Sequence, residues 1–486
     1  MSFLWYDLET FGRDPRRSRI AQFAALRTDD DLHEIGEPVS LFCKPASDLL
    51  PSPLAALVTG ITPQRAQAEG LSEPDFIGRV QDCMAEPGTC SAGYNSLRFD
   101  DEFVRFSLYR NFHDPYEREW RNGNSRWDLL DVLRLAHALR PDALVWPTRE
   151  DGFTSFKLED LAKANGVREG QAHEALSDVR ALLGLARKLR DAQPRFWDYA
   201  LELRSKRTVM SRLDVISHTP VLHVSGRLPA AHRHGGLMAP LGLHPALPGR
   251  VVALDLSVDP AAFAALSQDE LRQRVFSRRD ALPLGQIRLP LKEIQANRCP
   301  AIVPLAHVRS SELDVLGIDL TLAQARAEWL RMNPDFVAAC VALFDRRFDA
   351  GDAVDPDLDL YGGFATDADR RLFPGIRTAA PESLHGFASR LQDPRLIALL
   401  FRYQARNYGE SLTAGQAADW VEHRRAVFDG RAGSAELDAG QFAVELAQAR
   451  QRVAESTSGA DAAVLLDQVE AFASAQLGDV GLALPS

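Results

Sequence analysis

The first 190 residues alternate short strand patterns with amphipathic helix patterns, and this alternation limits the possible folds more than any other feature of the chain. The expected strands are Phe3–Leu8, Ile20–Thr28, Val39–Cys43 and Thr89–Gly93, and the expected helices are Glu73–Met84, Asp100–Tyr109, Trp127–Leu139, Leu158–Asn165 and Ala175–Leu189. Because short connections join the first three strands, we expect them to pair antiparallel. Residues 1–190 are therefore predicted to form a mixed sheet covered by helices, an α/β domain.

The secondary-structure pattern of the sequence changes twice after this segment. Residues 195–348 contain short β-like runs separated by Pro- and Gly-containing loops, at Val221–Val224, Val251–Leu256 and Ile287–Leu291. Residues 356–486 are dominated by helical patterns, at Asp367–Phe373, Pro394–Tyr408, Ala414–Phe428 and Asp461–Leu477. We therefore expect a β-rich second domain and a helical third domain, which suits a length of 486 residues.

Composition bounds the compartment and the partners. The chain has 56 Lys and Arg against 67 Asp and Glu, and the net charge of −11 argues against a partner as acidic as nucleic acid. The 5 cysteines show no zinc-ligand spacing, which favours unpaired thiols in a reducing compartment. No apolar run reaches the length of about 18 residues that a membrane span requires, so we expect a soluble cytoplasmic protein.

Asp7 and Glu9 lie two residues apart in the first expected strand. Because side chains alternate along a strand, both carboxylates should lie on the same face. Two like charges at that spacing on a half-buried face are costly unless a cation lies between them. The alternative is an ordinary alternating strand with a polar face, and this pair alone does not decide between them.

Two further segments carry candidate acids and a candidate base. Asp100 follows a strand end and opens an expected helix, where it is either a site residue or an N-terminal cap. His173 and Asp178 lie just before and inside the strongly periodic helix from residue 175. A histidine near a helix start is commonly a surface residue, so each segment taken singly remains ambiguous.

Taken in order, the three motifs Asp-x-Glu, Asn-x-x-x-Phe-Asp and His-x-x-x-x-Asp resemble the DEDD exonuclease superfamily, in its branch with a catalytic histidine. Longer stretches closely resemble the bacterial exodeoxyribonuclease I family, among them Asp7-Leu-Glu-Thr-Phe-Gly-Arg13, Asn124-Ser-Arg-Trp-Asp-Leu-Leu-Asp131, His223-Val-Ser-Gly226 and Glu422-His-Arg-Arg425. The resemblance covers nearly the whole chain and is weakest after about residue 430. It implies a ribonuclease H-like α/β exonuclease domain at 1–190, a β-rich SH3-like domain at 195–348 and an α-helical C-terminal domain at 356–486, in one monomer.

The resemblance also implies a reaction: Mg²⁺-dependent 3′→5′ hydrolysis of single-stranded DNA to 5′-mononucleotides, in DNA repair and recombination. Asp7, Glu9 and Asp178 would hold two Mg²⁺ ions, for which Mn²⁺ can substitute, and Asp100 would complete the site. His173 would act as the general base. Glu9 would also contact the substrate.

Candidate DNA contacts are basic and aromatic residues, because phosphates attract cations and unpaired bases stack on rings. The resemblance favours Arg105, Tyr116, Trp120, Arg134 and Lys157. Residues 195–233 hold seven basic and three acidic residues, and Lys206 and Arg207 are the candidates there. Exposed helix arginines, core aromatics and a solvated helix face are the alternatives.

The family resemblance further implies a protein partner, the acidic C-terminal tail of single-stranded DNA-binding protein. Arg140, Tyr199 and Arg331 are the candidate contacts for that tail. Two other functions stay open at this stage. One is an RNA-trimming or proofreading exonuclease of the same superfamily, and the other is a catalytically inactive DNA-binding or scaffold protein.

Overall fold

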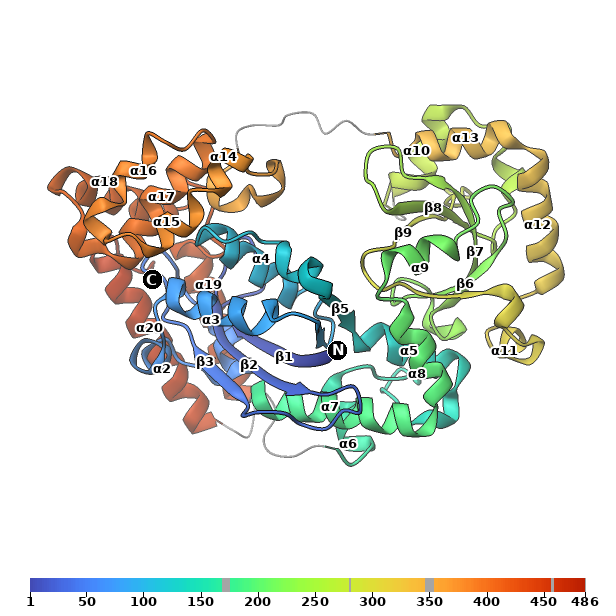
Figure 1. The fold of residues 1–486 in the computed structure, drawn as a ribbon, viewed down its shortest axis with the longest axis horizontal. Helices are drawn as coiled ribbons and strands as arrows, with labels where there is room; N and C mark the ends of the chain where they lie inside the picture. The colour runs from blue at the N-terminus through green and yellow to red at the C-terminus, as the bar shows by residue number, and fades with distance from the viewer. Residues whose placement is uncertain (168–174, 279–280, 346–353, 456–458, 486) are drawn as a thin grey trace. The chain divides into compact units, whose positions relative to one another are not determined.

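The computed structural model describes residues 1–167, 175–278, 281–345, 354–455 and 459–485 (Figure 1). The chain divides into two compact units. Unit 1 comprises residues 1–125, 169–180 and 351–486, and unit 2 comprises residues 126–168 and 181–350. Within the described ranges, no helix combines the length and the apolar character needed to cross a membrane.

The first sheet carries the N-terminal strands in the order β3-β2-β1-β4-β5. Its strands are β1 (Ser2–Thr10), β2 (Ile20–Thr28), β3 (Val39–Phe42), β4 (Thr89–Gly93) and β5 (Ser125–Asp128). β1 pairs antiparallel with β2, and β2 pairs antiparallel with β3, as the short connections predicted. β1 pairs parallel with β4, which makes the sheet mixed.

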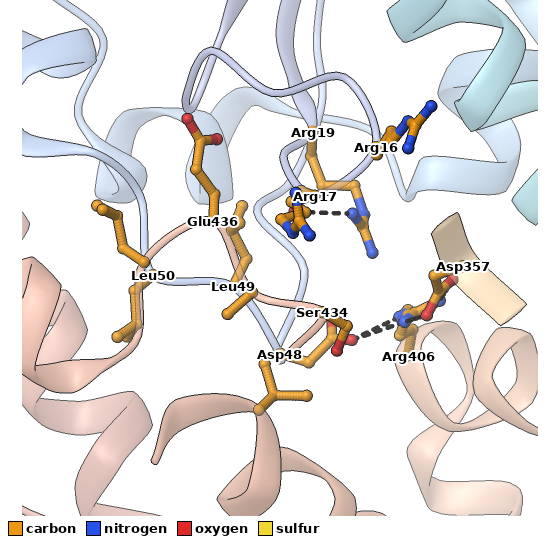
Figure 2. Close-up of a pocket in the computed structure, with 13 residues that line it drawn as sticks. Arg16, Arg17, Arg19, Asp48, Leu49, Leu50, Asp357, Arg406, Ser434 and Glu436 are labelled. Carbon is orange, nitrogen blue, oxygen red and sulfur yellow. Dashed lines mark hydrogen bonds and ion pairs between the residues drawn. The ribbon is translucent and has the colours of Figure 1, made fainter. Parts of the chain in front are cut away.

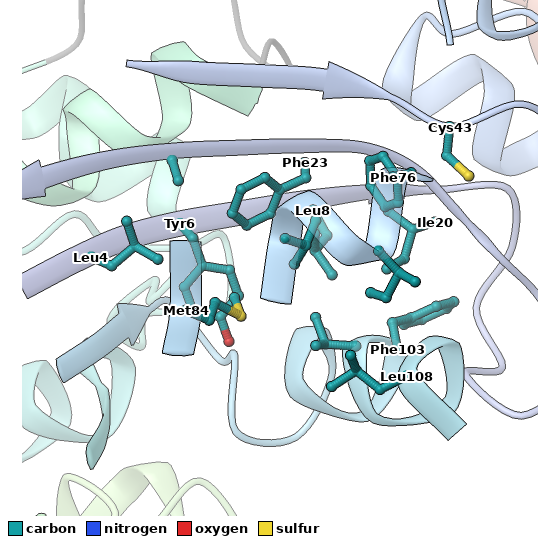
Figure 3. Packing of buried hydrophobic residues seen from close by; sticks show 14 residues of the cluster. Leu4, Tyr6, Leu8, Ile20, Phe23, Cys43, Phe76, Met84, Phe103 and Leu108 are labelled. Atoms are coloured by element: carbon teal, nitrogen blue, oxygen red, sulfur yellow. The ribbon is translucent and has the colours of Figure 1, made fainter. Parts of the chain in front are cut away.

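One face of β1 is part of the hydrophobic core of unit 1. Leu4, Tyr6 and Leu8 are almost fully buried and pack with side chains of the helices α3 (Glu73–Ala85) and α4 (Asp100–Arg110) (Figure 3). Burying a large apolar side chain stabilises the fold by about 1.5–3 kcal/mol. Because side chains alternate along a strand, this packing places the intervening residues on the opposite face of β1.

The C-terminal helices belong to the same unit as strands β1 to β4 of this sheet. The remaining helices of unit 1 are α1 (Pro53–Thr59), α2 (Pro63–Glu69), α14 (Asp367–Arg370), α15 (Phe373–Thr378), α16 (His385–Ala388), α17 (Pro394–Asn407), α18 (Ala414–Phe428), α19 (Ala439–Glu455) and α20 (Gly459–Gly478). The Phe112 ring lies 5.6 Å from the rings of both Phe373 and Tyr403, so N-terminal and C-terminal segments share one core. Leu54 of α1 packs in a second shared core with Phe442 of α19.

Unit 2 is built around an antiparallel sheet in the order β10-β6-β7-β8-β9. Its strands are β6 (Val221–Val224), β7 (Gly235–Leu243), β8 (Arg250–Asp255), β9 (Leu291–Gln295) and β10 (Ala301–Pro304). Its helices are α5 (Leu129–Leu139), α6 (Leu158–Ala164), α8 (Pro194–Glu202), α9 (Lys206–Ser211), α10 (Gln268–Phe276), α11 (Ser310–Val315), α12 (Leu320–Met332) and α13 (Pro334–Ala342). One more helix, α7 (Ala175–Ala192), begins among the residues of unit 1 and ends among those of unit 2.

Several element boundaries differ from the sequence prediction. The strand expected at Ile287–Leu291 is wrong, because pairing with β8 begins only at Leu291, after Pro290. The expected helix from Trp127 begins at Leu129, since the Asp128 carboxylate accepts from the amide of Leu130 and caps it. The helix expected at Asp367–Phe373 divides into α14 and α15.

Candidate active site

Three carboxylates meet on the face of β1 opposite the hydrophobic core. Asp7 and Glu9 come from β1, and Asp178 comes from the first turn of α7. One oxygen from each carboxylate lies within 4.8 Å of the oxygens of the other two. The prediction that Asp7 and Glu9 share a face is confirmed, and the third acid comes from the helix that the sequence indicated.

Asp100 is tied to the same strand. The amide of Leu8, between Asp7 and Glu9 in sequence, donates to the Asp100 Oδ1 at 3.2 Å. Asp100 is buried at the start of α4, and Phe99 rather than Asp100 occupies the N-cap position. The capping alternative for Asp100 is therefore wrong, because its carboxylate reaches across to β1.

A buried polar network lies directly beside these acids. The Tyr6 hydroxyl donates to the Asp101 Oδ1 at 2.9 Å, and the Arg118 Nη2 donates to the same oxygen at 2.7 Å. All three residues are at most 1% exposed. Tyr6 precedes Asp7 and Asp101 follows Asp100, so the network fixes β1 against α4 at the position of the candidate site. Sequence reasoning missed it, although adjacent acids at 100 and 101 were a visible signal.

The electrostatics of the three acids call for a cation. Burial raises the pKa of Asp7 well above its ordinary value, and the charges of Asp100, Glu9 and Asp178 raise it further. Burial, Asp178 and Asp100 together raise the pKa of Glu9 to about 8. Carboxylates in this state are stabilised by a bound cation, because it offsets both desolvation and mutual repulsion.

The donor set decides which cation fits. The group consists of carboxylates among the described residues, and Cys43, Cys83, Cys90, Cys299 and Cys340 are not part of it. Hard carboxylate oxygens are the ligands that Mg²⁺ and Mn²⁺ prefer. Asp7, Glu9 and Asp178 therefore fit a divalent cation of this class. The candidate base His173 lies outside the described residues.

Three predicted DNA contacts, Arg105, Tyr116 and Trp120, belong to unit 1. The Arg105 guanidinium donates to both Glu119 oxygens, at 2.6 and 2.9 Å, and its Nη1 donates to Glu102 at 2.9 Å. Its side chain is only 8% exposed, so Arg105 is engaged in an ionic cluster rather than open to solvent. Its Cζ lies 5.4 Å above the Tyr116 ring, whereas Trp120 is 65% exposed.

Two aromatics from the C-terminal part of unit 1 join this cluster. The Tyr116 and Phe364 ring centroids lie 5.7 Å apart, and the Tyr361 hydroxyl donates to Glu102. Phe364 is 78% exposed. Sequence reasoning missed both Tyr361 and Phe364, because about 250 residues separate them from Tyr116 and neither belongs to a motif.

The other predicted DNA contacts lie in unit 2. The Arg134 Nη1 donates to Asp131 at 2.9 Å, and its Cζ lies 5.7 Å above the Phe156 ring. Lys157 is exposed directly before α6, and Lys206 and Arg207 are exposed at the start of α9.

The candidate partner contacts also lie in unit 2, and each has an internal partner. The Arg140 Nη1 donates to Glu312 at 2.6 Å, and the Tyr199 hydroxyl donates to the Ile302 carbonyl at 2.8 Å. Arg331 forms an exposed ion pair with Glu328.

Comparison with known proteins covers almost the entire chain. Residues 4–186 match the family model described as Exonuclease, residues 204–346 match the Exonuclease I SH3-like domain, and residues 354–476 match the Exonuclease I C-terminal domain. These three matches confirm the expected succession of an α/β exonuclease domain of the ribonuclease H-like class, an SH3-like domain and a helical C-terminal domain.

Individual relatives agree with these matches. Exodeoxyribonuclease I of Escherichia coli (strain K12) is 40% identical over 427 residues, which cover 88% of this chain and 90% of the relative. The structure of Exonuclease I from Methylocaldum szegediense superimposes with a TM-score of 0.92 at 41% identity, over 98% of this chain and 99% of the other. Exonuclease I of E. coli in complex with a dA16 oligonucleotide gives a TM-score of 0.92 at 38% identity, with the same coverage.

Proposed function

Because the chain belongs to the bacterial exodeoxyribonuclease I family, we propose that it is a Mg²⁺-dependent exonuclease that degrades single-stranded DNA from the 3′ end. Its products are 5′-mononucleotides, and it works as a cytoplasmic monomer in DNA repair and recombination. The observation that carries the proposal is the group of Asp7, Glu9 and Asp178, whose oxygens lie within 4.8 Å of one another.

The proposed mechanism assigns a role to each residue of the site. Asp7, Glu9 and Asp178 hold two divalent cations, and Asp100 completes the site from α4. Bound divalent cations stabilise charge on the attacking and leaving oxygens of phosphodiester hydrolysis. His173 accepts the proton of the attacking water, and a positioned base of this kind accelerates the reaction by about 10²–10⁴-fold.

The proposed DNA contacts are assigned within each unit separately. We assign the exonuclease domain to 1–190, the SH3-like domain to 195–348 and the helical domain to 356–486. The exposed side chains of Trp120, Lys157, Lys206 and Arg207 bind bases and phosphates, because stacking and cationic contacts need accessible groups. Within unit 1 Arg105 orients the ring of Tyr116, and within unit 2 Arg134 orients the ring of Phe156.

Local charge explains how a chain of net charge −11 binds DNA. The acids of the site face cations in the working enzyme, and the basic residues of 195–233 contact the phosphate chain. Total charge is therefore a poor guide to the partner of this chain.

The proposed protein partner is the acidic C-terminal tail of single-stranded DNA-binding protein. We assign Arg140, Tyr199 and Arg331 as its contacts. Binding of a tail peptide to the variant with Arg140→Glu and Arg331→Glu tests this assignment, and unchanged affinity would refute it.

One assay tests the reaction itself. A single-stranded oligonucleotide labelled at its 3′ end should lose the label at once as a mononucleotide, whereas a 5′ label should move gradually through shorter products. Omission of Mg²⁺ should stop both the release of the 3′ label and the shortening of the 5′-labelled strand. Preferred attack on RNA would favour the RNA-trimming alternative, and binding without any product would favour an inactive DNA-binding protein.

A further inference from the structure

The loop between β1 and β2 follows directly on the candidate site, and a carboxylate from the C-terminal part of unit 1 holds its backbone. Glu436 lies before α19, in a cavity that also involves Arg16 and Arg17 of the loop (Figure 2). Its Oε1 accepts hydrogen bonds from the amide of Arg13 at 2.7 Å and from the amide of Asp14 at 3.2 Å. One side chain therefore satisfies two consecutive amides of the loop, about 420 residues away in sequence.

The second oxygen of Glu436 lies against the loop backbone at Gly12. A Cβ atom built on Gly12 would lie 2.1 Å from the Glu436 Oε2 and 2.7 Å from the Ser18 Oγ. A larger residue at this position would therefore require the Glu436 carboxylate or the Ser18 hydroxyl to move. The absence of a side chain at Gly12 therefore lets the Glu436 carboxylate lie close to the loop backbone.

The contact is connected to Glu9 by a short path. The Thr10 hydroxyl donates to the Gly12 carbonyl at 2.6 Å, and the register of β1 against β2 shifts between Glu9 and Thr10. Irregularities of this kind change the direction of the neighbouring side chain. A displacement of Gly12 would therefore be transmitted to Glu9 along the three peptide units between them and through the hydrogen bond from Thr10 to Gly12.

A second carboxylate from the same region is connected to the start of the loop through Ser52. The Glu445 Oε1 of α19 accepts from the amide of Leu54 at 3.2 Å and from the Ser52 hydroxyl. The amide of Ser52 in turn donates to the Phe11 carbonyl at 2.8 Å. Residues 436–445 thus hold the start of the loop directly and through α1.

We propose that Glu436 is a positioning residue, which fixes the loop after β1 and thereby the direction of the Glu9 carboxylate. The proposal rests on the proposed function, because Glu9 matters only if it binds the catalytic cation. It gives the C-terminal segment a role in the reaction, beyond completing a helical bundle.

The test compares Glu436→Ala with Glu436→Gln in the full-length protein. Loss of the acceptor in Glu436→Ala should lower kcat on single-stranded DNA by about 10–100-fold, since displacements near 1 Å have effects of this size. The KM for DNA should stay unchanged, and the half-saturating Mg²⁺ concentration should rise. Glu436→Gln should retain most of the activity, because its amide oxygen can accept from the same two amides.

A second measurement is independent of catalysis. Hydrogen exchange at the amides of Arg13 and Asp14, in metal-free protein, should accelerate in Glu436→Ala and stay close to wild type in Glu436→Gln. The matched control is Glu455→Ala. This substitution removes an exposed carboxylate of α19 that accepts a hydrogen bond from the Gln451 side chain. This control should change neither kcat nor exchange.

The outcomes separate the two proposals. A lower melting temperature in Glu436→Ala with unchanged kcat and Mg²⁺ dependence would reduce Glu436 to a structural contact and overturn the inference. If Glu436→Ala fails to fold, Glu436→Asp replaces it, because its shorter side chain retracts from the two amides; wild-type kcat in that variant would equally overturn the inference. A wild-type protein without nuclease activity would refute the proposed function, while the exchange data would still report whether Glu436 holds the loop.

Discussion

Unit 1 contains two groups of buried or half-buried carboxylates and surrounds them in opposite ways. Asp7 and Glu9 face a further acid at the candidate site. Asp48 and Asp357 instead face a guanidinium, because Arg406 donates to Asp48 at 2.7 Å from its Nη2 and to Asp357 at 2.9 Å from its Nη1 (Figure 2). Arg402 adds a hydrogen bond of 2.6 Å to Asp357. We call the group of Asp48, Asp357, Arg402 and Arg406 the ionic cluster.

The pKa directions express this difference. Burial raises the pKa of Asp48 and Asp357, but the surrounding arginines, with Arg406 the strongest, together outweigh burial and hold each pKa below its ordinary value. At the site, burial and like charges act together, and the pKa of Glu9 rises to about 8. A buried acid with its own cationic side chain serves the fold, whereas buried acids that repel one another mark a place for a bound ion.

The largest expected effect comes from breaking the site. Asp7→Ala removes one of the proposed cation ligands and should lower kcat on single-stranded DNA by about 10³-fold, which corresponds to roughly 4 kcal/mol of lost transition-state stabilisation. Initial rates with an end-labelled oligonucleotide measure it. Asp82→Ala, an exposed acid on α3, is the control and should keep the wild-type rate. Equal rates for Asp7→Ala and wild type would remove Asp7 from the site.

Disrupting the ionic cluster should lower the free energy of unfolding and leave kcat unchanged. Arg406→Ala leaves Asp48 and Asp357 buried without their shared partner, and loss of one partner of a buried ion pair costs about 3–5 kcal/mol. Urea unfolding measures the change, and kcat at a temperature where the variant is folded should match wild type. A loss below about 0.5 kcal/mol would contradict the assignment of the cluster to stability.

The two groups also differ in how far the sequence predicts them. Asp7 and Glu9 follow from the strand period, because local spacing decides which face they occupy. Asp48 and Arg406 are 358 residues apart, and no local pattern records that they pair. Arg105 was predicted as a DNA contact, and its ion pair with Glu119 was not foreseen, because no periodic pattern records the pairing of two residues 14 positions apart.

The fold shows the same division between local and distant information. Residues 20–28 and 414–428 form the strand and the helix that periodicity predicts, with identical bounds. β7 was missed because Gly235, Gly236 and Pro240 weaken its strand pattern, and its pairing with β6 and β8 overrides that weakness. α19 was missed as well, although its buried face packs against α1 and α20.

Acid should weaken the ionic cluster selectively. Asp48 and Asp357 have folded-state pKa values below the unfolded value of about 4, so they stabilise the protein above that pH and this contribution is lost as pH falls further. Melting temperatures between pH 6 and pH 3 should therefore fall more steeply for wild type than for Arg406→Met, which lacks the strongest cause of the lowered pKa values. The effect should be smaller than that of Arg406→Ala, because pH 3 reaches only the upper part of the titration range. If the melting temperatures of wild type and Arg406→Met fall in parallel with pH, the pairing of Asp48 and Asp357 with Arg406 does not stabilise the fold as proposed.

Removing one acid should change the free energy of unfolding in opposite directions in the two groups. Asp178→Asn relieves repulsion with Asp7 and Glu9, and it should stabilise the metal-free protein by about 1 kcal/mol, the equivalent of a shift of somewhat less than one pKa unit. Asp48→Asn removes a partner of Arg406 and should destabilise under the same conditions. Urea unfolding in excess EDTA measures both, and added Mg²⁺ should stabilise wild type more than Asp178→Asn, because a ligand stabilises only the state that binds it. If both substitutions destabilise the metal-free protein equally, Asp178 does not repel Asp7 and Glu9 to a measurable extent. The electrostatic argument for a cation between these three acids then fails.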